Sequence, residues 1–266
     1  MVKAVVSLKK LKRLRVTIES DAPASLAQLP PLTSLQANIR GVEGGEQAGN
    51  AAAALFRKVL ETSQATLTSL VLYSGRSDHP GRFEHVFGPL EAQPDGSEIV
   101  KPQHLNPTLK FTKLEKLVLN AFHIMPAHAL RLAGVIDFSK LTYLELRGLH
   151  NSVFACQLNT EWTNLKKIYL CYNPNLKDFL GKCRGLETIF LAHTPQMSPN
   201  DISPLIEKIV GNHGKTLKTF ALQPAEPFPQ LVPALSIFHL RKLGEGCRLL
   251  RELWMAFDFE NYWVIL

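Results

Sequence analysis

Leu186-Glu-Thr-Ile189-Phe-Leu191 is one of nine segments in which apolar residues occupy the first, fourth and sixth of six positions. All 27 of these positions are apolar in a chain that is 45% apolar, so composition alone does not explain the pattern. A short motif that recurs along a whole chain is typical of repeat proteins. The other eight segments begin at Leu11, Leu32, Leu67, Leu114, Leu141, Leu165, Leu217 and Leu250.

Each segment predicts one short strand, with its fourth and sixth residues pointing inward and its fifth pointing outward. Between the segments, apolar residues recur at helical spacing over 51–62, 201–210 and 232–243, and Gly244 is a stop signal for the last of these helices. Strands and helices that alternate in this way stack into a parallel solenoid. We therefore expect an α/β solenoid of about nine irregular repeats, with a curved parallel sheet inside and helices and loops outside.

The repeats run through nearly the whole chain, so we expect a single domain over 1–266. Pro and Gly are dense over about 74–110, which predicts an irregular insertion. Residues 257–266 are too apolar to be expected to remain exposed to solvent. They are expected to cap the end of the solenoid, or alternatively to begin another repeat.

The outward face of the predicted strands carries the candidate partner-binding residues. Tyr169 and Phe190 hold the same position in successive repeats and should lie side by side, since neighbouring strands are about 4.8 Å apart. Exposed aromatic side chains commonly anchor protein interfaces. The predicted concave recognition surface consists of Tyr73, Tyr143, Glu145, Arg147, Tyr169, Phe190 and Trp254.

Several segments resemble a known family. Cys183-Arg-Gly-Leu186 and Cys247-Arg-Leu-Leu250 resemble the cysteine-containing leucine-rich repeat that is typical of F-box proteins. His213-Gly-Lys-Thr-Leu217 is similar to a turn of the same ribonuclease-inhibitor-like superfamily, and Pro30-Pro-Leu32 and Trp162-Thr-Asn-Leu165 look like its fungal members. The resemblance implies a leucine-rich-repeat fold over roughly residues 8–258.

The resemblance also implies a function, namely non-catalytic protein recognition as the substrate-binding part of an F-box-type ubiquitin-ligase adaptor. Catalysis would then belong to partner subunits. No F-box is found before the first repeat at Leu11, so ligase subunits are expected as partners only if an F-box lies upstream. Two alternatives stay open: a free-standing leucine-rich-repeat scaffold with no link to ubiquitin, and a nuclear protein that associates with nucleic acid.

The nucleic-acid alternative depends on where the charge lies. The chain holds 30 Lys and Arg against 23 Asp and Glu, a net charge of +7. Residues 1–18 hold six of the basic residues and no acid, so the remaining 24 basic and 23 acidic residues nearly balance. The excess charge is therefore expected in one N-terminal basic patch, formed by Lys9, Lys10, Lys12, Arg13 and Arg15.

No motif in the sequence predicts catalysis, a cofactor or a metal. Gly211-Asn-His-Gly214-Lys215-Thr216 has two residues between its glycines where a phosphate-binding loop needs four. The four cysteines form no Cys-x-x-Cys pair of the kind that binds zinc. Because no motif predicts catalysis, we do not expect an enzyme. There is neither a long apolar segment that would span a membrane nor a signal peptide, so we expect an intracellular protein, cytoplasmic or nuclear.

Overall fold

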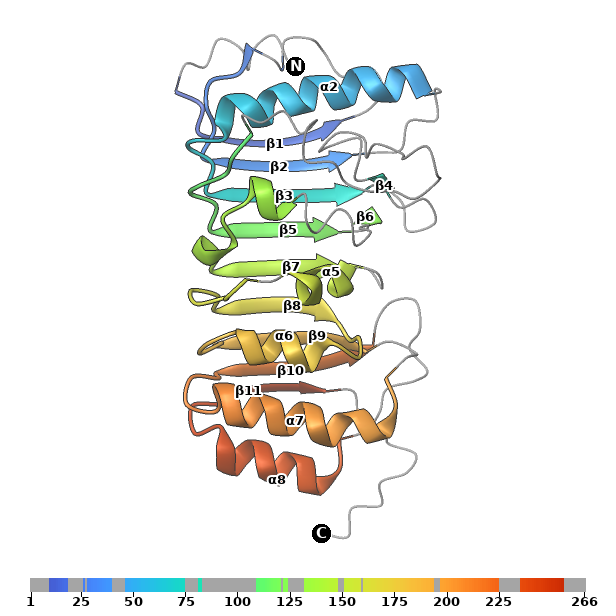
Figure 1. Cartoon of the computed structure of the whole chain (residues 1–266), viewed down its shortest axis with the longest axis vertical. Helices are drawn as coiled ribbons and strands as arrows, with labels where there is room; N and C mark the ends of the chain where they lie inside the picture. Colours follow the sequence, from blue (N-terminus) through green and yellow to red (C-terminus); the bar gives the residue numbers. More distant parts are fainter. Residues whose placement is uncertain are drawn as a thin grey trace. The chain divides into compact units, whose positions relative to one another are not determined.

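The computed structural model divides the chain into two compact units, residues 1–141 and 142–266. Each unit is built from short parallel strands alternating with helices or turns (Figure 1). The α/β class and the parallel strands predicted from the repeats are therefore confirmed. The structure describes residues 10–18, 26, 28–39, 46–74, 81–82, 109–120, 122–123, 132–147, 151–158, 160–193, 197–224 and 235–255.

The first unit contains four parallel strands that neighbour one another in the order β1-β2-β3-β5. A long helix, α2, connects β2 to β3, and a small two-stranded sheet pairs β4 with β6. The elements of this unit are β1 (Arg13–Ile18), β2 (Ser34–Ile39), α2 (Glu46–Ser63), β3 (Ser69–Ser74), β4 (Gly81–Arg82), β5 (Lys116–Asn120), β6 (Phe122–His123) and the 3-10 turn η3 (Phe138–Lys140).

The second unit contains five parallel strands in the order β7-β8-β9-β10-β11. Its helices contact one another in sequence, α5 with α6, α6 with α7, and α7 with α8, so helices and strands progress together (Figure 1). The elements are β7 (Tyr143–Arg147), α5 (Asn151–Gln157), β8 (Lys167–Cys171), α6 (Leu176–Lys182), β9 (Thr188–His193), α7 (Pro199–His213), β10 (Thr219–Pro224), α8 (Ile237–Gly246) and β11 (Glu252–Met255).

The strands begin at the third residue of each of the nine predicted segments. Neighbouring strands pair in the repeat register within each unit, so Leu35 lies opposite Leu70 and Ile189 opposite Phe220. From β2 to β10, the fourth and sixth residues of every segment are buried. The repeat pattern therefore predicts the register as well as the existence of the strands, because a one-residue shift would expose the entire leucine set.

Helices form where the sequence supplies both an apolar face and a start signal. Helix α7 begins after Ser198, whose hydroxyl forms a reciprocal capping box with Asp201, and has Pro199 in its first turn. Helix α8 begins after Ser236 and continues past the predicted stop at Gly244 to Gly246. The predicted helix at 232–243 is therefore shifted toward the C-terminus. Its Ser236 cap, rather than the apolar spacing, determines where it starts.

Some predictions fall on residues outside the described part of the chain. This applies to most of the insertion at 74–110, of which only Ser74, β4 and residues 109–110 are described. It applies also to the apolar segment at 257–266. Within the described residues, no helix combines the length and the apolar character needed to cross a membrane.

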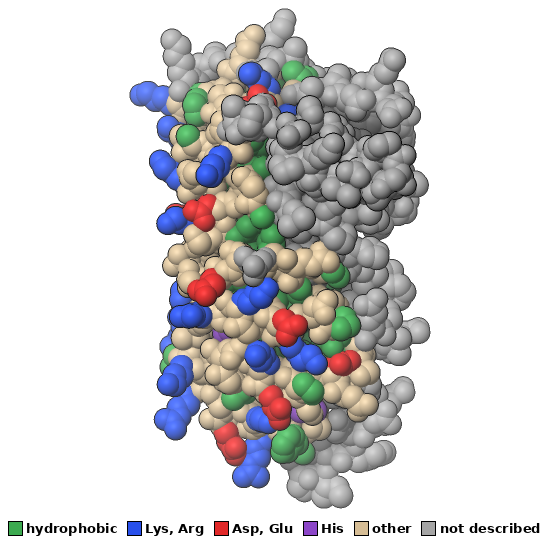
Figure 2. Space-filling model, viewed as in Figure 1, with side chains coloured by type: hydrophobic (Ala, Val, Ile, Leu, Met, Phe, Trp, Pro, Cys, Tyr) green, Lys and Arg blue, Asp and Glu red, His purple; other side chains and the backbone are tan. Residues whose placement is uncertain are grey.

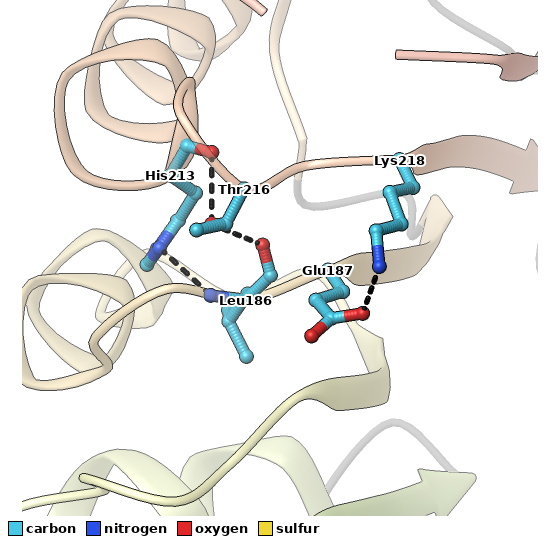
Figure 3. A network of polar contacts seen from close by, with 5 residues as sticks. All are labelled: Leu186, Glu187, His213, Thr216 and Lys218. Atoms are coloured by element: carbon cyan, nitrogen blue, oxygen red, sulfur yellow. Dashed lines mark hydrogen bonds and ion pairs between the residues drawn. The ribbon is translucent and has the colours of Figure 1, made fainter. Parts of the chain in front are cut away.

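A polar clamp joins successive repeats at two places among the residues that the structure describes. In the second unit, the Leu186 N–H donates to Nδ1 of His213 at 3.4 Å, and Oγ1 of Thr216 donates to the Leu186 carbonyl at 2.9 Å (Figure 3). The first unit repeats this arrangement. The Leu32 N–H donates to Oγ of Ser63 at 3.0 Å, and Oγ1 of Thr66 donates to the Leu32 carbonyl at 2.7 Å.

The two clamps have the same spacing, since Ser63 and His213 each lie four residues before a leucine that starts a segment, and a threonine lies one residue before it. In both, the clamp satisfies the N–H and C=O of the fully buried leucine that starts the preceding segment. The repeats are thus related by hydrogen bonding as well as by leucine spacing.

Close backbone contact between α7 and α8 explains two glycines. A Cβ added at Gly246 would lie 2.2 Å from Cγ1 of Val210, and one added at Gly214 would lie 2.3 Å from the Gly246 carbonyl oxygen. Neither distance is compatible with a side chain. The glycines therefore permit the close approach of the two helix ends, which seats α8 against α7.

Candidate functional site

The outward residues of the second unit form a continuous row, which we call the outward row. Strand pairing places Glu145 of β7 opposite Tyr169 of β8, and Tyr169 opposite Phe190 of β9. The row continues through Ala221 of β10 to Trp254 of β11. All five hold the fifth position of their repeat, the position that the sequence predicts to point outward.

Tyr169 is the centre of a stack. Its ring lies parallel to that of Phe190, with centroids 5.8 Å apart and an interplanar angle of 18°. On the side of β7, the guanidinium carbon of Arg147 lies 4.3 Å from the Tyr169 centroid. Since β8 lies between β7 and β9, Tyr169 has Arg147 on one face and Phe190 on the other. Both faces of the Tyr169 ring are therefore in contact with other residues of the second unit.

Arg147 is held in place by the carboxylate of Glu145. The Arg147 Nε–H donates to Oε1 of Glu145 at 2.5 Å, and the Tyr143 hydroxyl donates to Oε2 at 2.6 Å. Burial would lower the pKa of Arg147, but the Glu145 carboxylate, together with Tyr169 and Tyr143, outweighs burial and raises that pKa. Glu145 is only 6% exposed. It serves to orient Arg147 and Tyr143, because both of its oxygens accept hydrogen bonds from within the cluster.

Trp254 forms the far end of the row and is 55% exposed. Ala221, which separates it from Phe190, is fully buried between these larger neighbours. Two strand spacings put Trp254 about 10 Å from Phe190. The row therefore presents two apolar anchors with a shallow step between them.

The outward position does not always mean exposure. Val71 and Val118, which hold the fifth position in the first unit, are buried, as are Glu145 and Ala221 in the second. Strand periodicity predicts the direction of a side chain, but exposure depends also on the size of its neighbours. For Glu145 and Ala221 those neighbours are the Tyr143–Arg147 pair and the two flanking aromatic residues.

The structure brings together six of the seven predicted surface residues, all from the second unit. The seventh, Tyr73, lies half-buried on β3 of the first unit, between Asn38 and Asn120 in the strand pairing. The N-terminal basic patch also belongs to the first unit. Lys10, Lys12, Arg13 and Arg15 are exposed, Arg13 and Arg15 on one face of β1, and Lys9 lies outside the described residues.

A serine–histidine pair on α7 and α8 was not predicted from the sequence. Nε2 of His239 lies 2.7 Å from Oγ of Ser203, a distance typical of an activated nucleophile. However, Nδ1 of His239 accepts the Ser236 N–H at 3.1 Å, so the proton resides on Nε2 and is donated to Ser203. A ring in this tautomer cannot take the serine proton. His239 here serves as the reciprocal cap of α8.

The cysteines are free thiols in the structure. Cys183 and Cys247, at equivalent repeat positions, are both buried, and burial raises the pKa of each thiol. Burial likewise raises the pKa of Cys156 to about 11. These thiols are therefore protonated and weakly nucleophilic near neutral pH. Among the residues that the structure describes, no three His, Cys, Asp or Glu side chains are grouped to hold a metal ion.

Sequence reasoning also missed a basic margin of the second unit. We define the basic margin as the turns that lead into β8 to β11 together with the first strand residues, 160–167, 183–188, 214–219 and 247–252. The net charge of the chain does not reveal the margin, because acidic residues in other segments balance its charge. The repeat alignment itself contained the signal, since Arg184, Lys215 and Arg248 stand at the same place in three successive repeats.

No protein-family model matches the chain, and no curated protein matches it in sequence. The outward row and the repeats that build it are therefore the features from which a function can be inferred.

Proposed function

We propose that this chain is a leucine-rich-repeat protein that recognises another protein through the outward row of its second unit. The observation that carries this proposal is the Arg147–Tyr169–Phe190 stack with the exposed Trp254 beyond it. Tyr, Trp and Arg are the residues that most often dominate the energy of protein interfaces. A row set on paired strands is also rigid, so little conformational entropy would be lost when a partner binds.

The leucine-rich-repeat assignment is supported by the strand at every predicted segment, the buried fourth and sixth positions, and the parallel pairing in repeat register. The two clamps support it further, because repeated hydrogen bonding at fixed spacing is expected of a stacked array. In such an array the strands line the concave surface. We infer that the outward row is part of that surface.

The resemblance of Cys183-Arg-Gly-Leu186 and Cys247-Arg-Leu-Leu250 to F-box proteins suggests which kind of recognition this is. In the proposal, the chain holds the substrate of a ubiquitin ligase and leaves catalysis to other subunits.

Affinity purification with mass spectrometry tests this function. The tagged chain and its Phe190→Ala/Trp254→Ala variant would be purified from cells that express the protein naturally. A Phe238→Ala variant is a matched control, because Phe238 is an exposed aromatic residue on α8 rather than on the sheet. We expect one protein to be recovered with both the wild type and the control. The row variant should recover about tenfold less of it or lower still, because removing interface hot spots weakens binding by at least that factor.

The same purification separates the two forms of the proposal. A Skp-type adaptor and a cullin among the recovered proteins would support the ligase role, and their consistent absence alongside a row-dependent partner would indicate a free-standing scaffold. Equal recovery of every protein with the wild type and the row variant would refute recognition through the row.

A further inference from the structure

The basic margin of the second unit lies next to the outward row. It contains seven basic residues and three acidic ones, a local charge of +4. Figure 2 shows Lys and Arg side chains gathered along the side where the strands of this unit begin. The basic residues are Lys166, Lys167, Arg184, Lys215, Lys218, Arg248 and Arg251, and the acidic residues are Glu161, Glu187 and Glu252.

Backbone hydrogen bonds set the spacing of this margin. The backbone N–H of Glu187 donates to the Lys166 carbonyl, that of Lys218 to the Glu187 carbonyl, and that of Arg251 to the Lys218 carbonyl, each at 2.8 Å. These residues therefore follow one another at about the strand spacing, and the margin is roughly 15 Å long from Lys166 to Arg251.

Most of the charge of the margin faces solvent. All of its basic residues except Lys166 are exposed. Glu187 is neutralised by Lys218, whose Nζ lies 2.6 Å from Oε2, and this hydrogen bond is the main reason that the pKa of Glu187 is lowered. Glu161 lies 4.0 Å from Arg184. After these pairings a clear positive excess remains.

Lys167 connects the margin with the row. It precedes Tyr169 by two residues on β8, so its side chain points to the same face of the sheet about 7 Å away. The rings of the row also favour negative groups. Tyr169 has neighbours on both faces, and the edges of aromatic rings carry the positive part of their quadrupole.

We propose that the partner binds the outward row with a peptide segment in which apolar side chains are combined with Asp and Glu, and that these acids lie along the basic margin. This inference rests on the proposed function and specifies the chemistry of its partner. The apolar side chains contact Phe190 and Trp254, while the carboxylates lie near Lys167, Lys215 and Arg251.

A peptide suits this surface better than a nucleic acid does. Bases bind proteins by stacking on open aromatic faces, whereas Tyr169 is covered on both faces by Arg147 and Phe190. Glu161 and Glu252 on the margin would also oppose a uniform line of phosphates. A peptide can instead place a neutral or basic residue opposite each of them.

Selection from displayed random peptides of about ten residues, which span both the margin and the row when extended, tests the inference. Peptides enriched on the whole protein should combine Asp or Glu with aromatic or aliphatic residues. The margin variant Lys167→Glu/Lys215→Glu/Arg251→Glu should bind the selected peptides about tenfold more weakly and lose the preference for acids. Added salt should weaken binding to the wild type, because it screens exposed charges.

The control variant Lys177→Glu/Lys208→Glu/Arg241→Glu changes the net charge by the same amount on the helices, and it should keep both affinity and preference. Thermal unfolding of each variant would establish that it is folded. Enrichment of apolar peptides that need Phe190 and Trp254 but show no preference for acids, or a preference that the margin variant keeps, would overturn the inference and leave the proposed function standing.

Two other results would be decisive. Selected peptides that bind equally well to the Phe190→Ala/Trp254→Ala variant would overturn the proposed function itself. Displacement of those peptides by duplex DNA as readily as by an excess of the same peptide would show binding to any polyanion, and would overturn the assignment of an acidic peptide.

Discussion

Replacing Trp162 by alanine is expected to lower the free energy of unfolding by about 3–5 kcal/mol, the usual cost of removing a large aromatic side chain from a core. Trp162 is fully buried in the turn before β8 and packs edge-to-face on Phe179 of α6, with centroids 5.3 Å apart. The indole therefore joins a turn to a helix, and its removal leaves a cavity between them. Chemical denaturation followed by circular dichroism would measure the loss.

Trp254 supplies the matched control, since it is the same residue type on the outward face. Because its side chain is 55% exposed, Trp254→Ala should change the unfolding free energy by no more than about 0.5 kcal/mol. A loss for Trp254→Ala comparable to that for Trp162→Ala would show that Trp254 is covered in the folded protein. It would then be part of the core and not a recognition residue.

The His213 clamp predicts a stability that falls in acid. Burial lowers the pKa of His213 to about 4, with a smaller contribution from Lys208, while the Leu180 carbonyl opposes the shift. The ordinary pKa of 6.5 applies in the unfolded chain, so the folded protein disfavours the charged ring. The contribution of His213 to the free energy of unfolding is fully present above pH 6.5. It decreases as the pH falls toward 4, by about 3 kcal/mol in all, since each pKa unit corresponds to 1.36 kcal/mol.

A His213→Gln variant isolates this effect, because glutamine does not titrate in this range and its carbonyl oxygen can accept the Leu186 N–H. Unfolding free energies of both proteins between pH 7 and pH 4 should diverge, with the wild type losing more. His239, whose pKa is also lowered, chiefly by burial, contributes equally to both and cancels in the difference. Parallel pH dependences would mean that His213 is not buried as a neutral ring.

The nine strands and their register could be predicted from leucine spacing because burial enforces it. Leu117, Leu144 and Ile189 are fully buried, and any other register would place them in water. The capped start of α8 was less predictable, since a serine three residues before His239 competes with many similar signals in the chain. Local hydrogen bonds decided that boundary rather than hydrophobic periodicity.

The outward row could be predicted in composition but not in detail. The alignment predicts that Tyr169 and Phe190 are neighbours, and their stacked rings agree with it. It does not predict that Arg147 would cover the other face of Tyr169, because that depends on the bond from Arg147 to a buried Glu145. The basic margin, in contrast, could have been found in the same alignment, because Arg184, Lys215 and Arg248 share one position in successive repeats.

Site-specific photo-crosslinking from position 190 tests the central claim most directly. A photoreactive phenylalanine analogue would replace Phe190 in the stack, or Phe238 on α8 as the control, in cells that express the protein. If the outward row is the recognition surface, irradiation should link position 190 to a discrete partner protein that position 238 does not capture. Absence of any crosslinked protein at position 190, or the same set of products from both positions, would contradict the proposed role of the row.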